Sequence, residues 1–172
     1  MAENEMKKIH VSKATVNIGV GQVGDRVEKA VELLEKLTGK EAVRTDSTDA
    51  SAGFGKRSGL KIGARVTLRG EEAEEFIKKV LPAADNEIDA EAFDGNGNFS
   101  FGVTEYIDVP GIDYDADIGM MGFEVAVNLE RPGYRVKKRE HKPSEIGKEH
   151  KITDEEAKKF VEEHLGAEVV EE

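Results

Sequence analysis

The chain has 172 residues, of which 38% are hydrophobic, so it can bury a sizeable core, while the absence of cysteine excludes disulfides and thiolate metal sites. No apolar run reaches the roughly eighteen residues that a transmembrane helix needs, and we therefore expect no membrane partner. The 36 acidic residues outnumber the 25 lysines and arginines, and the formal net charge of −11, taken alone, disfavours nucleic acid as a partner.

The first third of the chain predicts a strand, a helix and a second, short strand. Apolar and polar residues alternate over residues 11–20, which is typical of a strand with one packed face. Apolar residues at helical spacing follow, and Asp25 with Glu28 forms a capping pair that would start the helix. Gly39 would end it, because glycine is favoured just past a helix C-terminus. Residues 42–44 favour a short strand.

A long loop and a second strand and helix follow. Residues 46–60 are rich in serine, threonine, aspartate and glycine and predict an exposed loop, and loops of this length are usually functional or disordered. Alternation over residues 61–69 predicts a strand whose charged and hydroxyl side chains share one face. Residues 71–81 predict a helix with acids in its first turn, where the helix dipole favours them, and Pro82 ends it.

The last third predicts two more strands and a final helix. Aromatic and aliphatic residues alternate with small polar ones over residues 99–103 and again over 123–129, where a Pro-Gly pair follows the strand. A basic, proline-bearing connector then leads to a helix over residues 154–165. Thr153 and Glu156 form its capping box.

These elements predict an α+β fold in which helices pack on one face of an antiparallel sheet and the other face stays exposed. The reason is the alternation in every long strand, because parallel strands buried on both faces would be apolar throughout. We expect one domain over residues 1–172, with residues 133–172 as its basic connector and C-terminal helix.

The charges are segregated along the chain. Residues 50–69 contain five bases and no acid, and residues 131–142 contain six bases against Glu140. Acids gather over residues 71–94 and 154–172. This pattern is compatible with an RNA-facing side and an acidic solvent side, and equally with ordinary solvated loops and helix faces.

One motif suggests a different function. Residues 19–24 match G-x-G-x-x-G after a strand and before a helix, and Asp46 lies 22 residues beyond Gly24, as in a dinucleotide-binding oxidoreductase. Against this alternative, Thr15 and Asn17 make the strand half polar, and no second nucleotide-binding half follows. The glycines would then simply allow a tight turn between strand and helix.

No catalytic, cofactor or metal set stands out. The four histidines are scattered, at positions 10, 141, 150 and 164. An aspartate-rich loop over residues 108–117 lacks the spacing and the final glutamate of an EF-hand. We therefore expect no enzyme activity, no cofactor and no metal ion.

Six segments, in order along nearly the whole chain, resemble one family. They are Asn17–Gly21 (NIGVG), Leu37–Gly39 (LTG), Ala52–Gly59 (AGFGKRSG), Ile62–Gly70 (IGARVTLRG), Phe93–Val103 (FDGNGNFSFGV) and Pro110–Asp115 (PGIDYD). Together they resemble ribosomal protein five of the large subunit, a 5S-rRNA-binding family. Arg131–Val136 (RPGYRV) and the connector after it resemble the archaeal and eukaryotic branch.

The resemblance implies a structural constituent of the cytoplasmic ribosome in the central protuberance of the large subunit. Its partners would be 5S rRNA, 23S-type rRNA, neighbouring 5S-binding ribosomal proteins and P-site tRNA. The exposed sheet face would bind 5S rRNA through Thr15, Asn17, Lys61, Arg65, Thr67 and Arg69. The long loop would reach tRNA through Phe54, Lys56 and Arg57.

The chemistry of these residues suits RNA. Hydroxyl and amide groups bond to ribose and base edges, bases neutralise phosphates, and an aromatic ring can stack. Ordinary cross-strand pairing is the alternative for Asn17 and Thr67, and packing over its own loop is the alternative for Phe54. The chain departs from the family where Lys40 replaces a frequent glutamine and where Asp46 and Asp49 replace bases before the loop.

Overall fold

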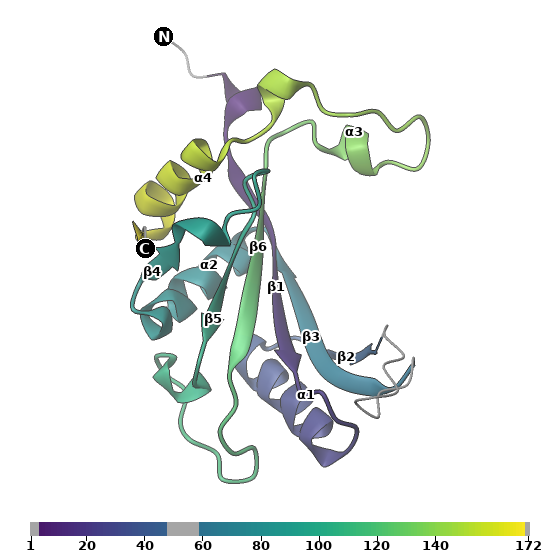
Figure 1. Ribbon diagram of the computed structural model, residues 1–172, viewed down its shortest axis with the longest axis vertical. Coiled ribbons are helices and arrows are strands. Elements are labelled where there is room, and N and C mark those ends of the chain that lie inside the picture. Colours follow the sequence, from purple (N-terminus) through teal and green to yellow (C-terminus); the bar gives the residue numbers. More distant parts are fainter. Residues whose placement is uncertain (1–3, 48–58, 171–172) are drawn as a thin grey trace.

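The structure is a computed structural model that describes residues 4–47 and 59–170. Its main sheet has five antiparallel strands in the order β2-β3-β1-β6-β5 (Figure 1). These strands are β1 (His10–Gly19), β2 (Val43–Asp46), β3 (Lys61–Arg69), β5 (Phe99–Val103) and β6 (Phe123–Glu130). The α+β prediction is confirmed. Asp46, predicted to begin the loop, instead ends β2, because it pairs with Lys61 of β3.

One face of the sheet is apolar and covered by helices. Val16 of β1 lies opposite Val66 of β3 and Val125 of β6, and all three side chains are buried. Residues directly opposite one another share a face, so the whole alternating apolar set points the same way. It packs against α1 (Asp25–Thr38) and α2 (Glu71–Val80) in one hydrophobic cluster.

One end of α1 agrees with the prediction from the sequence and the other does not. The helix ends at Gly39, which adopts the left-handed conformation with φ 67°, as predicted. The predicted capping pair at its start is wrong. Gly24 is the N-cap without a side-chain hydrogen bond, and Asp25 is the first helical residue. Glu28 instead accepts from the Arg44 guanidinium, so its carboxylate is unavailable for a cap.

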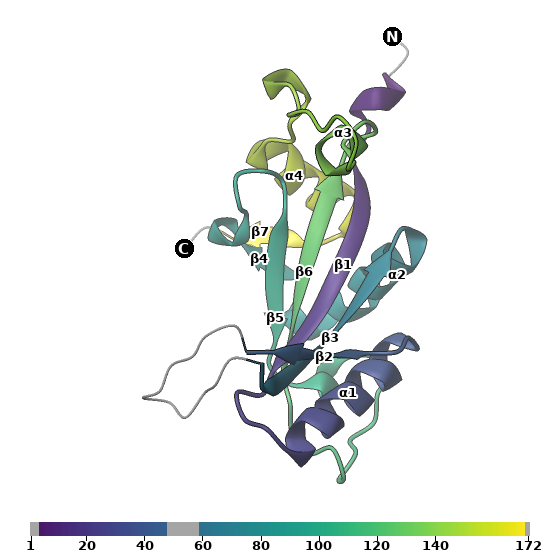
Figure 2. The same cartoon turned by 90° about the vertical axis from the view of Figure 1, so that its right-hand side faces the viewer.

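The C-terminal part begins with a connector at the end of the sheet where β1 starts (Figures 1 and 2). It contains the short helix α3 (Arg135–Lys138) and leads to α4 (Asp154–Phe160). The predicted capping box is confirmed, since the Thr153 hydroxyl accepts from the Glu156 N–H and the Glu156 carboxylate from the Thr153 N–H. The helix continues as a π-helical turn, Val161–Leu165, which is buried at both ends.

Several short elements escaped the sequence patterns. The parallel pair β4 (Glu87–Asp89) and β7 (Glu168–Val170) joins the C-terminal segment to the middle of the chain. Three residues are too few to show an alternation, so neither strand could be predicted. The α-helix predicted over 71–81 stops at Val80, just before Pro82. In the described residues, 3₁₀ turns form over Glu5–Lys7, Leu81–Ala84, Ala90–Ala92, Tyr106–Asp108 and Lys148–His150.

Candidate nucleic-acid interface

The open face of the sheet carries polar side chains in rows that cross the strands. In one row Arg65 of β3 lies opposite Asn17 of β1, which lies opposite Glu124 of β6. In the next row Thr67 lies opposite Thr15. In a third, Arg69, Lys13 and Asn128 follow one another across the same three strands. The register therefore brings polar groups from β3, β1 and β6 onto one surface.

Asn17 and Thr67 lie on this face as diagonal neighbours, and each is half-buried. In the described part of the chain neither side chain makes a hydrogen bond, although Thr67 stands directly opposite Thr15. Both point away from the helix-packed core. Because half-buried amide and hydroxyl groups are normally paired, their remaining hydrogen bonds go to water or to a partner.

The cations of the face differ in whether a carboxylate neutralises them. Arg65, Arg69 and Lys13 have no ion pair within the ranges that the structure describes. Lys61 does have one, with its ammonium 2.5 Å from the Asp46 carboxylate. Asp46, which stands where the family has a base, therefore offsets the charge of Lys61 at the edge of the face. Glu124 is the acid closest in register to Asn17.

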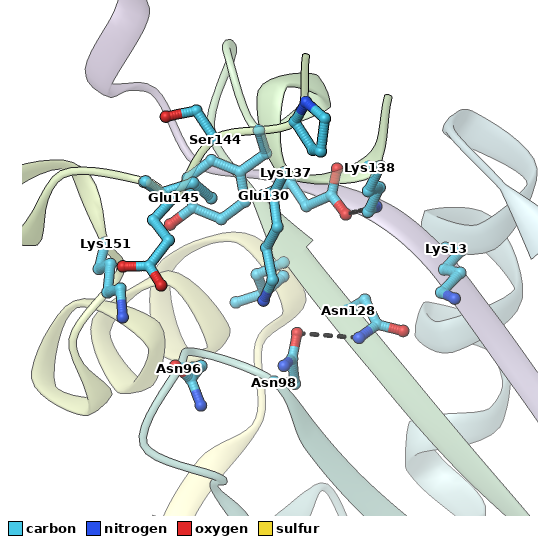
Figure 3. A pocket seen from close by; sticks show the side chains of 14 residues that line it. Lys13, Asn96, Asn98, Asn128, Glu130, Lys137, Lys138, Ser144, Glu145 and Lys151 are labelled. Carbon is cyan, nitrogen blue, oxygen red and sulfur yellow. Dashed lines mark hydrogen bonds and ion pairs between the residues drawn. The ribbon is translucent and has the colours of Figure 1, made fainter. Parts of the chain in front are cut away.

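The polar face continues into a pocket of about 600 Å³ between the sheet and the connector (Figure 3). Asn96, Asn98 and Asn128 enter it from the sheet side, and Lys137 and Lys151 from the connector side. The remaining lining residues are Lys13, Leu129, Glu130, Tyr134, Lys138, Pro143, Ser144, Glu145 and Ile146. No sequence pattern indicated this pocket. Lys13 was detectable, since it precedes Thr15 and Asn17 at the two-residue period of a strand.

Hydrogen bonds fix the asparagines of the pocket. The Asn98 amide donates to the Asp94 carboxylate at 2.7 Å, and the Asn128 amide donates to the Asn98 oxygen at 3.0 Å. Burial raises the pKa of the Asp94 carboxyl, but hydrogen bonds from the Asn98 side chain and from the backbone N–H groups of Asn96 and Asn98 outweigh it. The pKa of Asp94 therefore lies below its ordinary value. The charged carboxylate holds Asn98, which in turn holds Asn128.

Comparison with known proteins decides the family. The family model described as ribosomal protein L5 matches residues 4–57, and the model of the C-terminal part of the same ribosomal family matches residues 61–164. The chain belongs to the ribosomal protein L5 family. Large ribosomal subunit protein uL5 of Sulfurisphaera tokodaii is 46% identical over 98% of this chain and 96% of that protein. Those of Nanoarchaeum equitans and Methanococcus vannielii are also 46% identical, over 98% and 96% of this chain and 99% and 93% of their own.

Family membership confirms the archaeal-type resemblance and makes the chain a constituent of the large ribosomal subunit, where rRNA and other ribosomal proteins are its partners. Among the helices of the described residues, none combines the length and the apolar character that crossing a membrane requires.

One arginine of the basic segment 131–142 has a structural role in this L5-family protein. Arg131 was counted in the basic patch, but its side chain is only 5% exposed. Its guanidinium lies 2.7 Å from the Glu156 carboxylate and donates to the backbone oxygen of Lys151 at 3.2 Å. Tyr134 assists, since its hydroxyl donates to the His150 oxygen and accepts from the Ile152 N–H. Arg131 thus holds the connector to α4.

The tRNA-binding prediction falls largely outside the described residues, which exclude Phe54, Lys56, Arg57 and Asp49. Two hydrogen bonds fix where this segment leaves the sheet: the Ser47 N–H donates to the Leu60 oxygen and the Gly59 N–H to the Ser47 oxygen.

Lys40, where the family often has glutamine, pairs with Glu72 at 2.7 Å.

The glycine motif and the acidic loop both lie in the described part of the fold. β1, which precedes the glycine motif, is antiparallel to both of its neighbours, whereas a dinucleotide fold needs parallel strands there. Within residues 4–47 and 59–170 no group of three acids or histidines could hold a metal ion. Asp115 of the acidic loop instead accepts from Lys36 at 2.9 Å, and this hydrogen bond holds the pKa of Asp115 below its usual range.

Proposed function

We propose that this chain is a non-catalytic constituent of the large subunit that binds 5S rRNA on the open face of β1 and β3. The supporting observation is the register that brings Asn17, Thr67 and two arginines without ion pairs among the described residues onto one surface. Such a surface offers RNA its hydrogen bonds and its phosphate partners at the same time.

Each side chain has a distinct role in this proposal. The hydroxyls of Thr15 and Thr67 and the Asn17 amide bond to ribose 2′-hydroxyls and base edges, which is how proteins read the shallow minor groove and loops of RNA. Arg65 and Arg69 neutralise phosphates. They stand four residues apart on β3, about 14 Å, so they serve phosphates of different nucleotides. Lys61 contributes less, because Asp46 shares its charge.

The segment between β2 and β3 is proposed to reach P-site tRNA. Phe54 would stack on a base or ribose, while Lys56 and Arg57 would pair with the tRNA backbone. This role rests on the family resemblance of residues 52–59 and on the absence of acids from residues 50–69. It requires no contribution from the open face of the sheet.

A binding titration tests the main proposal. The chain should bind 5S rRNA at sub-micromolar concentration, and added salt should weaken the complex because bound counterions are released. Arg65→Ala should reduce the affinity and lower the salt slope by about one. Arg26→Ala is the matched control, since this exposed arginine lies on α1. Binding of NADH without binding of 5S rRNA would favour the oxidoreductase instead.

A further inference from the structure

The pocket between the sheet and the connector combines cations, amides and an aromatic wall. We infer that it binds a single unstacked nucleotide of the rRNA that lies on the open face. This inference rests on the proposed function, because the third polar row (Arg69, Lys13 and Asn128) runs from that face directly into the pocket. An RNA strand following this row arrives at the pocket without leaving the protein surface.

The charges of the pocket favour an anion. Of its four lysines, Lys138 is neutralised by Glu130. The ammonium groups of Lys13, Lys137 and Lys151 have no ion pair in the described part of the chain, and Glu145 is the remaining acid of the lining. Three cations against one carboxylate suit a phosphate and its neighbours along a nucleic-acid backbone.

The amides of the pocket favour a base. Asp94 fixes Asn98, whose oxygen accepts the Asn128 amide, so the nitrogen of Asn128 faces Asn98 and its oxygen faces the Lys13 side (Figure 3). The Asn128 carbonyl oxygen and one of its two N–H groups remain as an acceptor and a donor without a partner among the described residues. Paired donor and acceptor groups are what asparagine presents to the edge of a base, and unstacked bases of RNA expose such edges.

The wall of the pocket favours a flat ring. The Tyr134 ring is half-buried, and its hydroxyl is held by the His150 oxygen and the Ile152 N–H. Pro143 and Ile146 also line the pocket and add apolar surface to it. A rigid aromatic and aliphatic wall gives a base the stacking that it loses on leaving its helix. The volume, about 600 Å³, lies within the range of small-ligand pockets.

Two variants and a control test the inference in the 5S rRNA complex. Asn128→Ala should weaken binding on the order of tenfold, as loss of a base contact does. Lys137 is exposed, so its replacement should leave the fold unchanged. Lys137→Ala should weaken 5S rRNA binding severalfold and lower the salt slope by about one. Lys148→Ala removes the same charge from the same connector outside the pocket and should bind like the wild type.

A titration of the free full-length chain tests the pocket without RNA. With each of the four nucleoside 5′-monophosphates as probe, the NMR signals of the Asn98 and Asn128 side-chain amides should shift saturably for at least one. Inorganic phosphate should not reproduce these shifts. Equal shifts with phosphate would reveal a plain anion site, and the absence of shifts an unused pocket, and either result overturns the inference.

The outcomes separate the two proposals. If the wild type binds 5S rRNA and both pocket variants bind equally well, the pocket inference fails and the open-face proposal stands. If the wild type does not bind 5S rRNA, the proposed function fails, and the nucleotide titration alone decides whether the pocket accepts a nucleotide.

Discussion

Replacing the buried guanidinium of Arg131 tests how the connector is held to the domain. Arg131→Ala removes the hydrogen bond to Glu156 and the donors to the backbone oxygens of His150 and Lys151. A hydrogen bond to a charged group contributes about 1.5 to 3 kcal/mol. Glu156 is 43% exposed and is rehydrated after the change, so the larger penalty for an isolated buried charge does not apply.

We therefore expect Arg131→Ala to lower the free energy of unfolding by about 2 to 3 kcal/mol. For a chain of this length, that corresponds to a fall in melting temperature of about 4 to 12 °C. Urea and thermal unfolding followed by circular dichroism measure both quantities. We expect a single transition, as the prediction of one domain over residues 1–172 requires, because one hydrophobic cluster includes residues of the sheet and of α4.

Lys78→Ala provides the comparison, because it removes an exposed base from the ion pair with Glu74 on α2. Such surface pairs contribute well under about 1 kcal/mol. If Arg131→Ala destabilised the chain no more than Lys78→Ala, the connector would not depend on Arg131 and the reasoning would be refuted.

The same contact has a pH signature. Burial raises the pKa of the Glu156 carboxyl, but hydrogen bonds from the Thr153 N–H and the Arg131 guanidinium outweigh it and leave the pKa below the ordinary 4.5. Glu156 thus contributes stability that is fully present above about pH 4.5 and is lost as the pH falls through its lower folded value. Arg131→Ala should flatten this part of the stability curve.

Three further predictions concern individual side chains. Asp94→Asn should cost up to about 1 kcal/mol at neutral pH, since Asp94 is exposed and solvent screens its interactions, and the cost should shrink as the pH falls through the lowered pKa of Asp94; unfolding at pH 7 and pH 3 measures this. Gly63→Ala should destabilise the chain by about 1 to 3 kcal/mol in urea unfolding, since the added Cβ would stand 2.6 Å from the Ile18 oxygen and 2.7 Å from the Thr45 hydroxyl. Changing Lys56 and Arg57 together to Ala should leave 5S affinity within about twofold and impair tRNA-dependent translation, whereas a collapse of 5S binding would contradict the proposed division of labour.

The long strands, the end of α1 and the start of α4 were predictable because local rules govern them. β3 runs from Lys61 to Arg69 as predicted, since each side chain of a half-exposed strand records which face it occupies. Gly39 and the box of Thr153 with Glu156 follow from backbone geometry within one turn. The residues proposed for the open face follow from the same alternation.

Other features depend on packing between segments far apart in the chain. The sequence marked Arg131 as one more base of a patch, and the docking of α4 buries it. Asp46 was predicted to lie in a loop, but it pairs with Lys61 of β3 and therefore belongs to β2. The pocket combines Lys13, Asn98 and Lys137 from three distant segments, so no local pattern could indicate it.

The central claim is that the open face of β1 and β3 carries the RNA. Selective labelling of threonine methyl groups tests it directly, because Thr15 and Thr67 lie on that face while Thr38 is the last residue of α1, on the helix-covered side of the sheet. On saturation with 5S rRNA, we predict large shifts of the Thr15 and Thr67 signals and little change at Thr38. A complex in which Thr38 shifts and both open-face threonines stay unchanged would contradict the account.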